Sequence, residues 1–138
     1  MAGEWGLTDI RARIAALEAG GVTFAKWRDE IEAILDPRYY PIEWVEREVT
    51  EGRIDLLATE QAVIGVELRH YPGGAKELHG LFAAGSLERI RELIAAALQI
   101  AAGAGCTVAA IDSREGWARA LRDMGFVTDR VRIVKELR

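Results

Sequence analysis

The sequence predicts a layered α/β (α+β) domain in which helices flank a mixed, mainly antiparallel sheet. In the first third of the chain, apolar residues recur every three or four positions, which is typical of helices. Residues 53 to 85 instead alternate between apolar and polar side chains, as half-buried strands do. Two helical and two strand patterns then follow in turn. The predicted order is three helices, three strands, and then helix, strand, helix, strand.

Length and composition describe a small single domain. The 138 residues fit one domain, and a hydrophobic share of 50% excludes intrinsic disorder. The net charge of −4 argues against a protein that binds nucleic acid non-specifically. One cysteine, Cys106, suits a reducing compartment. Neither an export signal at the amino terminus nor an apolar stretch long enough to span a bilayer is found, so we expect no membrane contact.

The helical first third is predicted to contain three helices. Helical periodicity covers 7–19 and 24–35, and Pro41 suits the first turn of a third helix that ends at Gly52. We therefore divide the single domain into a helical N-terminal segment, 1–52, and a core, 53–138, on which this segment packs.

A meander of three strands opens the core. The strand patterns cover 54–58, 62–71 and 76–83. The last two strands are joined by 71–74, Tyr-Pro-Gly-Gly, in which proline presets one turn dihedral and glycine permits a positive φ. These features predict antiparallel pairing.

The rest of the core alternates helices with strands. A long helix is predicted to begin at Ser86, whose hydroxyl can accept a hydrogen bond from a first-turn amide. Residues 106–111 are small or β-branched, as expected of a strand covered on both faces. A helix over 113–124 ends at Gly125. The alternation within 126–137 predicts a last strand that closes the sheet.

This order of elements resembles the core of the GNAT (general N-acetyltransferase) superfamily. The most specific local match is 113–126, which looks like the last helix of that superfamily with its Gly-Phe ending. The combination of 71–74, Cys106 and 114–117 is similar to short GNAT-like proteins encoded by bacteriophages and prophages. The resemblance to the superfamily covers 53–138.

The resemblance implies an acetyl-coenzyme A site, but one of its motifs is incomplete here. Members of the superfamily hold the pyrophosphate on a loop patterned Arg/Gln-x-x-Gly-x-Gly/Ala at the start of the long helix, where amides and the helix dipole favour anions. In this chain Gly85 is kept, the basic residue is missing, and Glu88 adds a negative charge. An ordinary strand-to-helix turn is the alternative. The candidate cofactor-binding residues are Phe82, Gly85, Ser86 and Leu87.

Candidate catalytic residues lie on the third predicted strand. Amide formation requires a base that takes a proton from the amine and an acid for the departing thiolate. Glu77 and His79 are two residues apart and therefore project to one face of the strand. The region in which many superfamily members carry a tyrosine acid offers Leu121 instead. The alternative is that His79 is a hydrogen-bonded structural residue.

Other chemistries find little support. His70, His79 and Cys106 have no zinc-site spacing, and no metal is predicted. Ser113 lacks the glycine-framed turn of a serine hydrolase.

The aromatic residues of the first third suggest either packing over the sheet or a docking surface. Tryptophan and tyrosine are enriched in protein interfaces because they combine apolar area with a polar group. The helix over 7–17 is the part that we expect to dock on a neighbour. The aromatic residues are Trp5, Trp27, Tyr39, Tyr40 and Trp44.

Two main functional hypotheses follow, and a third, a small intracellular regulator that binds a metabolite in a vestigial cleft, is not distinguished from the first by the sequence. The leading one is a phage-type GNAT-like protein with a degenerate acetyl-CoA site and no bound cofactor, which acts in virion structure or assembly through contacts with itself or other virion proteins. The alternative is an acetyl-CoA-dependent N-acetyltransferase, an acyltransferase with an irregular pyrophosphate loop. The residues leave open whether the chain is an enzyme. The expected location is the virion or the host cytoplasm.

Overall fold

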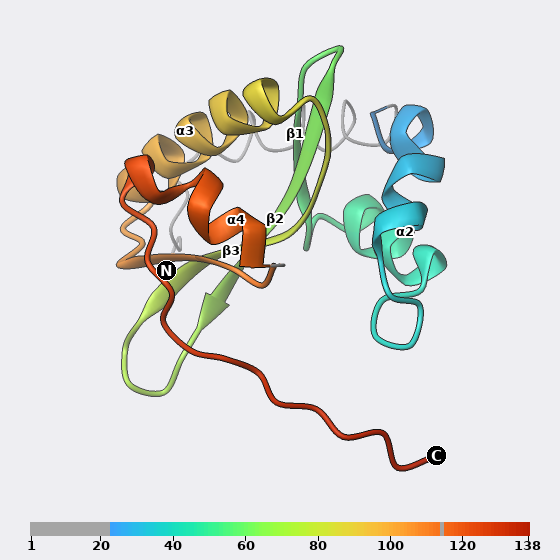
Figure 1. Ribbon diagram of the computed structural model, residues 1–138. Helices are drawn as coiled ribbons and strands as arrows, with labels where there is room; N and C mark the ends of the chain where they lie inside the picture. Colours follow the sequence, from blue (N-terminus) through green and yellow to red (C-terminus); the bar gives the residue numbers. More distant parts are fainter. Residues whose placement is uncertain (1–22, 114) are drawn as a thin grey trace.

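The computed structural model describes residues 23–113 and 115–138, and Figure 1 shows their arrangement. The predicted helix over 7–19, and Trp5 with it, lies outside the described residues. The elements are a helix over residues 23–34, α2 (Ile42–Thr50), β1 (Asp55–Ala58), β2 (Ala62–His70), β3 (Lys76–Gly85), α3 (Leu87–Gly103), β4 (Val108–Ile111), α4 (Glu115–Ala120) and a 3₁₀ turn (Arg122–Met124).

The four strands form one sheet in the order β1-β2-β3-β4. The first three are an antiparallel meander, as predicted, and β4 runs parallel to β3. Leu81 is an extra residue in β3, because Gly65 pairs with Phe82 while Val66 pairs with Gly80. Such a bulge bends a strand and redirects its side chains. The expected mixed, mainly antiparallel sheet is therefore confirmed.

Helices cover both faces of the sheet (Figure 1). The helix over residues 23–34 and α2 pack on one face, around Ile31, Val45 and Val63. On the other face α3 packs around Ile64 and Ile94. The aromatic residues Trp27, Tyr40 and Trp44 belong to the first of these clusters or pack against it. One core thus joins the N-terminal helices to the strands, whereas the division of the chain at residue 53 remains a prediction.

A glycine in β2 makes room for Phe82 in the cluster that the N-terminal helices cover. The ring of Phe82 lies so near Gly65 that a Cβ atom there would come within 2.2 Å of it. Any larger residue at this position would displace the ring. The pairing of β2 with the bulged half of β3 therefore depends on Gly65.

The start of α3 differs in one detail from the expectation. The Ser86 side chain makes no capping hydrogen bond. Its carbonyl accepts the amide of Ile90 at 2.9 Å, and its own amide donates to the Gln61 carbonyl at 3.0 Å. The backbone of Ser86, rather than its hydroxyl, thus fixes this helix start.

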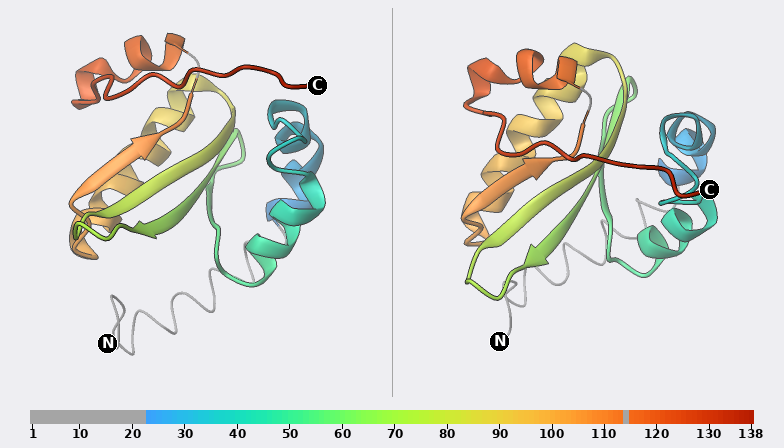
Figure 2. Two further views of the ribbon diagram at one scale, coloured as in Figure 1. Left: turned by 90° about the horizontal axis from the view of Figure 1, so that it is seen from below. Right: turned by 60° about the horizontal axis from the view of Figure 1, so that its bottom comes forward.

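The prediction of a last strand over 126–137 is wrong. These residues form no helix or strand, and Figure 2 shows them leaving the α4 region and crossing toward the N-terminal helices. A two-residue alternation sets the directions of side chains but does not provide a partner strand. Because this strand is missing, β4 is an edge strand of the described sheet. The prediction that both faces of β4 are covered is also wrong, since Val108 is 43% exposed.

Among the described residues, no helix has the length and apolarity needed to cross a membrane.

Candidate functional site

A cavity lies between the sheet and the helices that cover it, along β3 and β4. The two strands pair only from Glu77–Val108 to Gly80–Ile111, while β3 continues to Gly85. Beyond Gly80, within the described chain, the edge of β3 that faces β4 pairs with no strand. The cavity has a volume of about 370 Å³. Its lining includes Leu78, residues 80–83, Ile94, Ala97, residues 109–113, Trp117 and Phe126.

The shape of this cavity follows from local features of β3. Gly80 keeps β3 close to β4, because a Cβ atom there would lie 3.3 Å from Cγ1 of Ile111. The bulge at Leu81 comes next, at the point where pairing with β4 ends. Gly80 and the bulge at Leu81 thus mark the point where β3 stops pairing with β4 and continues along β2 alone.

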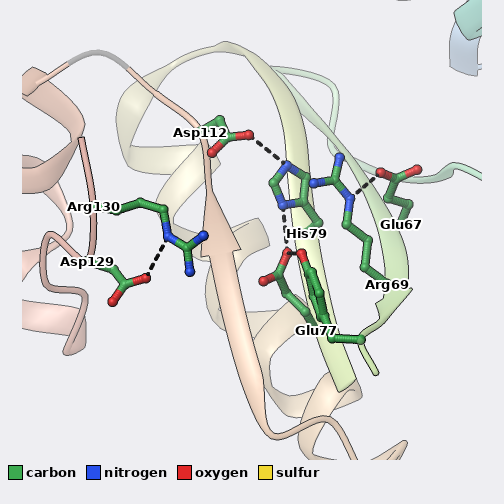
Figure 3. A network of polar contacts seen from close by, with 8 residues as sticks. Glu67, Arg69, Glu77, His79, Asp112, Asp129 and Arg130 are labelled. Atoms are coloured by element: carbon green, nitrogen blue, oxygen red, sulfur yellow. Dashed lines mark hydrogen bonds and ion pairs between the residues drawn. The ribbon is translucent and has the colours of Figure 1, made fainter. Parts of the chain in front are cut away.

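A polar cluster centred on His79 lies at the carboxyl end of β4 (Figure 3). The His79 ring is 3% exposed, and its Nδ1 lies 2.9 Å from Oε2 of Glu77. Its Nε2 lies 3.4 Å from Oδ2 of Asp112, a residue that also lines the cavity. The Tyr71 hydroxyl donates a hydrogen bond to the same Glu77 oxygen at 3.2 Å. The two predicted catalytic residues are therefore in direct contact, and Asp112 connects them to the cavity.

The hydrogen bonds of the cluster define a role for each ring nitrogen of His79. An ionised carboxylate is only an acceptor, so Glu77 favours the tautomer in which Nδ1 carries the hydrogen. Nε2 then carries the lone pair, and it lies beside Asp112, whose carboxylate can accept the hydrogen once Nε2 is protonated. A neutral histidine held in this way can accept a proton at Nε2, while Glu77 stabilises the resulting cation.

Arg69 and Glu67 form a separate ion pair on the adjacent strand (Figure 3). Nε of Arg69 lies 2.8 Å from Oε1 of Glu67. Burial opposes the charge of the guanidinium, but Glu67, Tyr71 and Tyr40 outweigh it and raise the pKa of Arg69. Although Glu67 is opposite His79 in the strand register, its charge is neutralised by Arg69. The carboxylates that contact His79 are those of Glu77 and Asp112.

The predicted cofactor residues fall into two groups. Phe82 is buried and lines the cavity. Gly85, Ser86 and Leu87 lie at the start of α3 and do not line it. Gly85 has a φ of 110°, and a Cβ atom there would lie 2.2 Å from the Gln61 carbonyl oxygen. A glycine is therefore required at position 85 by the close approach of the Gln61 backbone, whether or not this position contacts a cofactor.

Two residues of the cluster were missed in the sequence. Asp112 directly follows β4, and the carboxyl end of a parallel strand is a common place for ligand-binding residues, so this signal was available. Tyr71 stood out only as a turn residue. Its contact with Glu77 depends on the hairpin register, in which Arg69 pairs with Glu77. In the described chain no group of three His, Cys, Asp or Glu side chains is arranged to hold a metal ion.

Comparison with known proteins identifies the fold. No family model matches the sequence, and no curated protein matches it significantly. Among solved structures, a probable acetyltransferase superposes with a TM-score of 0.59 at 14% identity, over 88% of this chain and 95% of its own. A ribosomal-protein-alanine N-acetyltransferase from Brucella melitensis biovar Abortus 2308 gives 0.60 at 8% identity, over 85% and 93%.

The chain has the GNAT fold. The expected resemblance to this superfamily is thereby confirmed at the level of structure, and the resemblance to phage proteins stays a prediction. A transcriptional regulator from Bacillus halodurans C-125 also matches, with a TM-score of 0.53 at 18% identity over 72% of this chain and 79% of its own. Since proteins described so differently share the GNAT fold, activity has to be argued from the site.

Proposed function

We propose that this chain is an acyl-coenzyme A-dependent N-acyltransferase whose acyl donor lies between β3 and β4. The observation that carries the proposal is the contact of a buried Glu77–His79 pair with Asp112, a residue of the cavity wall. A proton acceptor and an apolar cleft thus meet at one place. The sequence alone put the assembly hypothesis first, and this geometry reverses the order of the two hypotheses.

The cavity suits the pantetheine arm of such a donor. Its lining is mostly apolar, from Leu78 and Phe82 on β3 to Ile94 on α3. The unpaired edge of β3 beyond Gly80 offers backbone N–H and C=O groups, which extended ligands with amide groups use as a partner strand. These residues fit the arm. Its thioester, when bound, supplies the acyl group.

The start of α3 fits a pyrophosphate less well. The Ser86 amide already donates to Gln61, and Glu88 places a negative charge in the first turn, where the helix dipole would otherwise attract an anion. We therefore assign the binding energy to the arm and expect weaker cofactor binding than a complete anion loop would give. Gly85, Ser86 and Leu87 remain proposed contacts of the phosphates.

The proton of the acceptor amine is assigned to His79. An amine loses a proton when it becomes an amide, and Nε2 of His79 can accept it beside Asp112. Glu77 holds the tautomer and stabilises the cation, and the Tyr71 hydroxyl donates to the same oxygen of Glu77. The exposed carboxylate of Asp112 can then pass the proton to water. No side chain is assigned as the acid for the departing thiolate, because the expected position is occupied by Leu121, which has no proton to donate, and the thiolate takes its proton from water.

The test combines calorimetric titration with acetyl-CoA and a thiol-release assay against a panel of primary amines. We expect Ala109→Leu, which narrows the cavity, to weaken binding, and Val108→Leu, on the exposed neighbouring position, to leave it unchanged. His79→Gln should lower turnover by about a hundredfold without loss of binding. His70→Gln, at the exposed end of β2, is the matched control. Absence of binding at millimolar acetyl-CoA would exclude the proposal.

The second candidate is the phage-type role in virion structure or assembly. It is favoured by the start of α3, where structural contacts occupy Gly85 and Ser86 and the anion-binding pattern is incomplete. On this hypothesis the acetyl-CoA titration gives no heat. The protein then binds itself or another virion protein, with the N-terminal aromatic segment as the proposed surface. Light scattering together with binding to purified virion proteins tests it, and a strict monomer without such a partner contradicts it.

A further inference from the structure

The C-terminal segment, residues 127–137, presents an uncovered apolar surface. Among described residues, 127–138 form no backbone hydrogen bonds with one another or with the body of the protein. The large apolar side chains in this segment are all more exposed than those elsewhere in the described chain, where the largest value is 50%, and four of the five are far more exposed. The five side chains are Val127 (85%), Val131 (78%), Ile133 (93%), Val134 (56%) and Leu137 (86%).

Contacts between the C-terminal segment and the rest of the chain are made by even-numbered residues. The amide of Phe126 donates to the Leu121 carbonyl at 3.4 Å, which fixes the start of the segment. Further along, the Arg132 guanidinium lies 4.8 Å from the centre of the Tyr39 ring, and Glu136 forms an ion pair with Arg38. The odd-numbered positions, which carry most of the apolar side chains, are left exposed.

The odd-numbered positions of the segment are complementary to themselves. When the segment is aligned antiparallel with a copy of itself about Arg132, Val131 lies opposite Ile133 and Val127 lies opposite Leu137. Between these apolar pairs, Asp129 lies opposite Lys135. Directly opposite side chains in an antiparallel pair interact, and opposite charges stabilise it. A second copy of the chain therefore supplies a matching partner for each of these six residues.

We propose that two copies of this protein associate by pairing their C-terminal segments as antiparallel strands about a two-fold axis at Arg132. Pairing satisfies backbone groups that are unpaired in the single chain, and the apolar side chains shield one another. A symmetric pair of identical surfaces is the commonest way in which proteins form dimers. The two Arg132 side chains would repel each other across the axis, but each can remain on the Tyr39 ring of its own chain.

Charge reversal tests this pairing, with sedimentation velocity and light scattering as the measurements. Asp129→Lys places two lysines opposite each other, and Lys135→Asp does the same with two aspartates. Since each pair occurs twice in the dimer, we expect either variant to bind its own copy about tenfold more weakly. The double variant restores opposite charges and should regain the original affinity. Asp129 forms an exposed ion pair with Arg130 in the described part of the chain, so its replacement should not change folding.

Two further variants make the result decisive. Glu60→Lys makes the same change in charge in the β1–β2 turn and should leave association unchanged. Ile133→Asp should abolish the dimer while the melting temperature of the monomer is kept. A protein that stays monomeric up to near-millimolar concentration would overturn the proposal. So would a dimer that tolerates both single charge reversals, or one that the double variant fails to restore.

Discussion

The two halves of β3 show how differently one strand can be used. In the first half, from Glu77 to Gly80, the strand pairs with β4 and carries buried ionisable side chains in contact with a cavity wall. In the second half, up to Gly85, pairing continues only with β2, and the last glycine packs against the Gln61 backbone. Ionisable side chains thus lie where β3 and β4 separate, while the other end of β3 is held by backbone contacts of Gly85 and Ser86.

The largest effect is expected at Gly85. Gly85→Ala adds a Cβ atom 2.2 Å from the Gln61 oxygen at a φ of 110°, so both a clash and backbone strain oppose it. We expect a loss of about 3 kcal/mol or more in the free energy of unfolding. Gly74→Ala is the matched control, since its φ is 94° but no atom lies within 4 Å. It should cost about 1 kcal/mol in urea denaturation. Equal losses would show that the close approach to Gln61 contributes nothing.

The next effect is expected in the first half of β3. His79→Leu removes the ring that pairs with Glu77 and leaves this carboxylate buried with Tyr71 alone. Because an unsatisfied buried group retains its desolvation cost, we expect a destabilisation of about 2 kcal/mol. His79→Leu with Glu77→Leu should recover part of it, measured by the same denaturation in a double-mutant cycle. Additive losses in that cycle would contradict the pairing.

A smaller effect is expected at the outer partner of Glu77. Tyr71→Phe removes the hydrogen bond to Oε2 of Glu77, together with the interaction of the hydroxyl with Arg69, from a residue that is 43% exposed. The expected loss of stability is about 0.5–1 kcal/mol. If the enzyme hypothesis holds, turnover should fall more than stability does, because the position of Glu77 determines that of His79. An unchanged turnover would restrict Tyr71 to a structural role.

The smallest effect concerns the layer that covers the cavity from the α3 side. Arg91 on α3 forms a two-pronged ion pair with Asp123, and this hydrogen bonding lowers the pKa of the Asp123 carboxyl. A carboxyl with a depressed pKa in the folded state contributes stability above its ordinary pKa of 3.8, and this contribution is lost as the pH falls through the lower value. Asp123→Asn should therefore flatten the acid limb of the melting-temperature profile. At neutral pH the change should be slight, since the pair is at the surface.

Much of the site could be read from the residues. The two-residue spacing of Glu77 and His79 fixes their common face, and the structure confirms that they touch. Asp112 carries a signal of its own as the residue that follows β4, but its contact with His79, like that of Tyr71 with Glu77, depends on how β4 and β2 align with β3. Nothing in the spacing along the chain carries that register.

The sequence by itself determined the order of the helices and the meander. Local periodicity and turn residues fix helices 23–34, α2 and α3 and the hairpin around Gly74, since they depend on neighbours a few residues away. Only the tertiary structure decided whether residues 126–137 form a strand. Their alternation is real, yet a strand exists only where it pairs with another strand, and within the described chain this segment pairs with none, not even with the outer edge of β4.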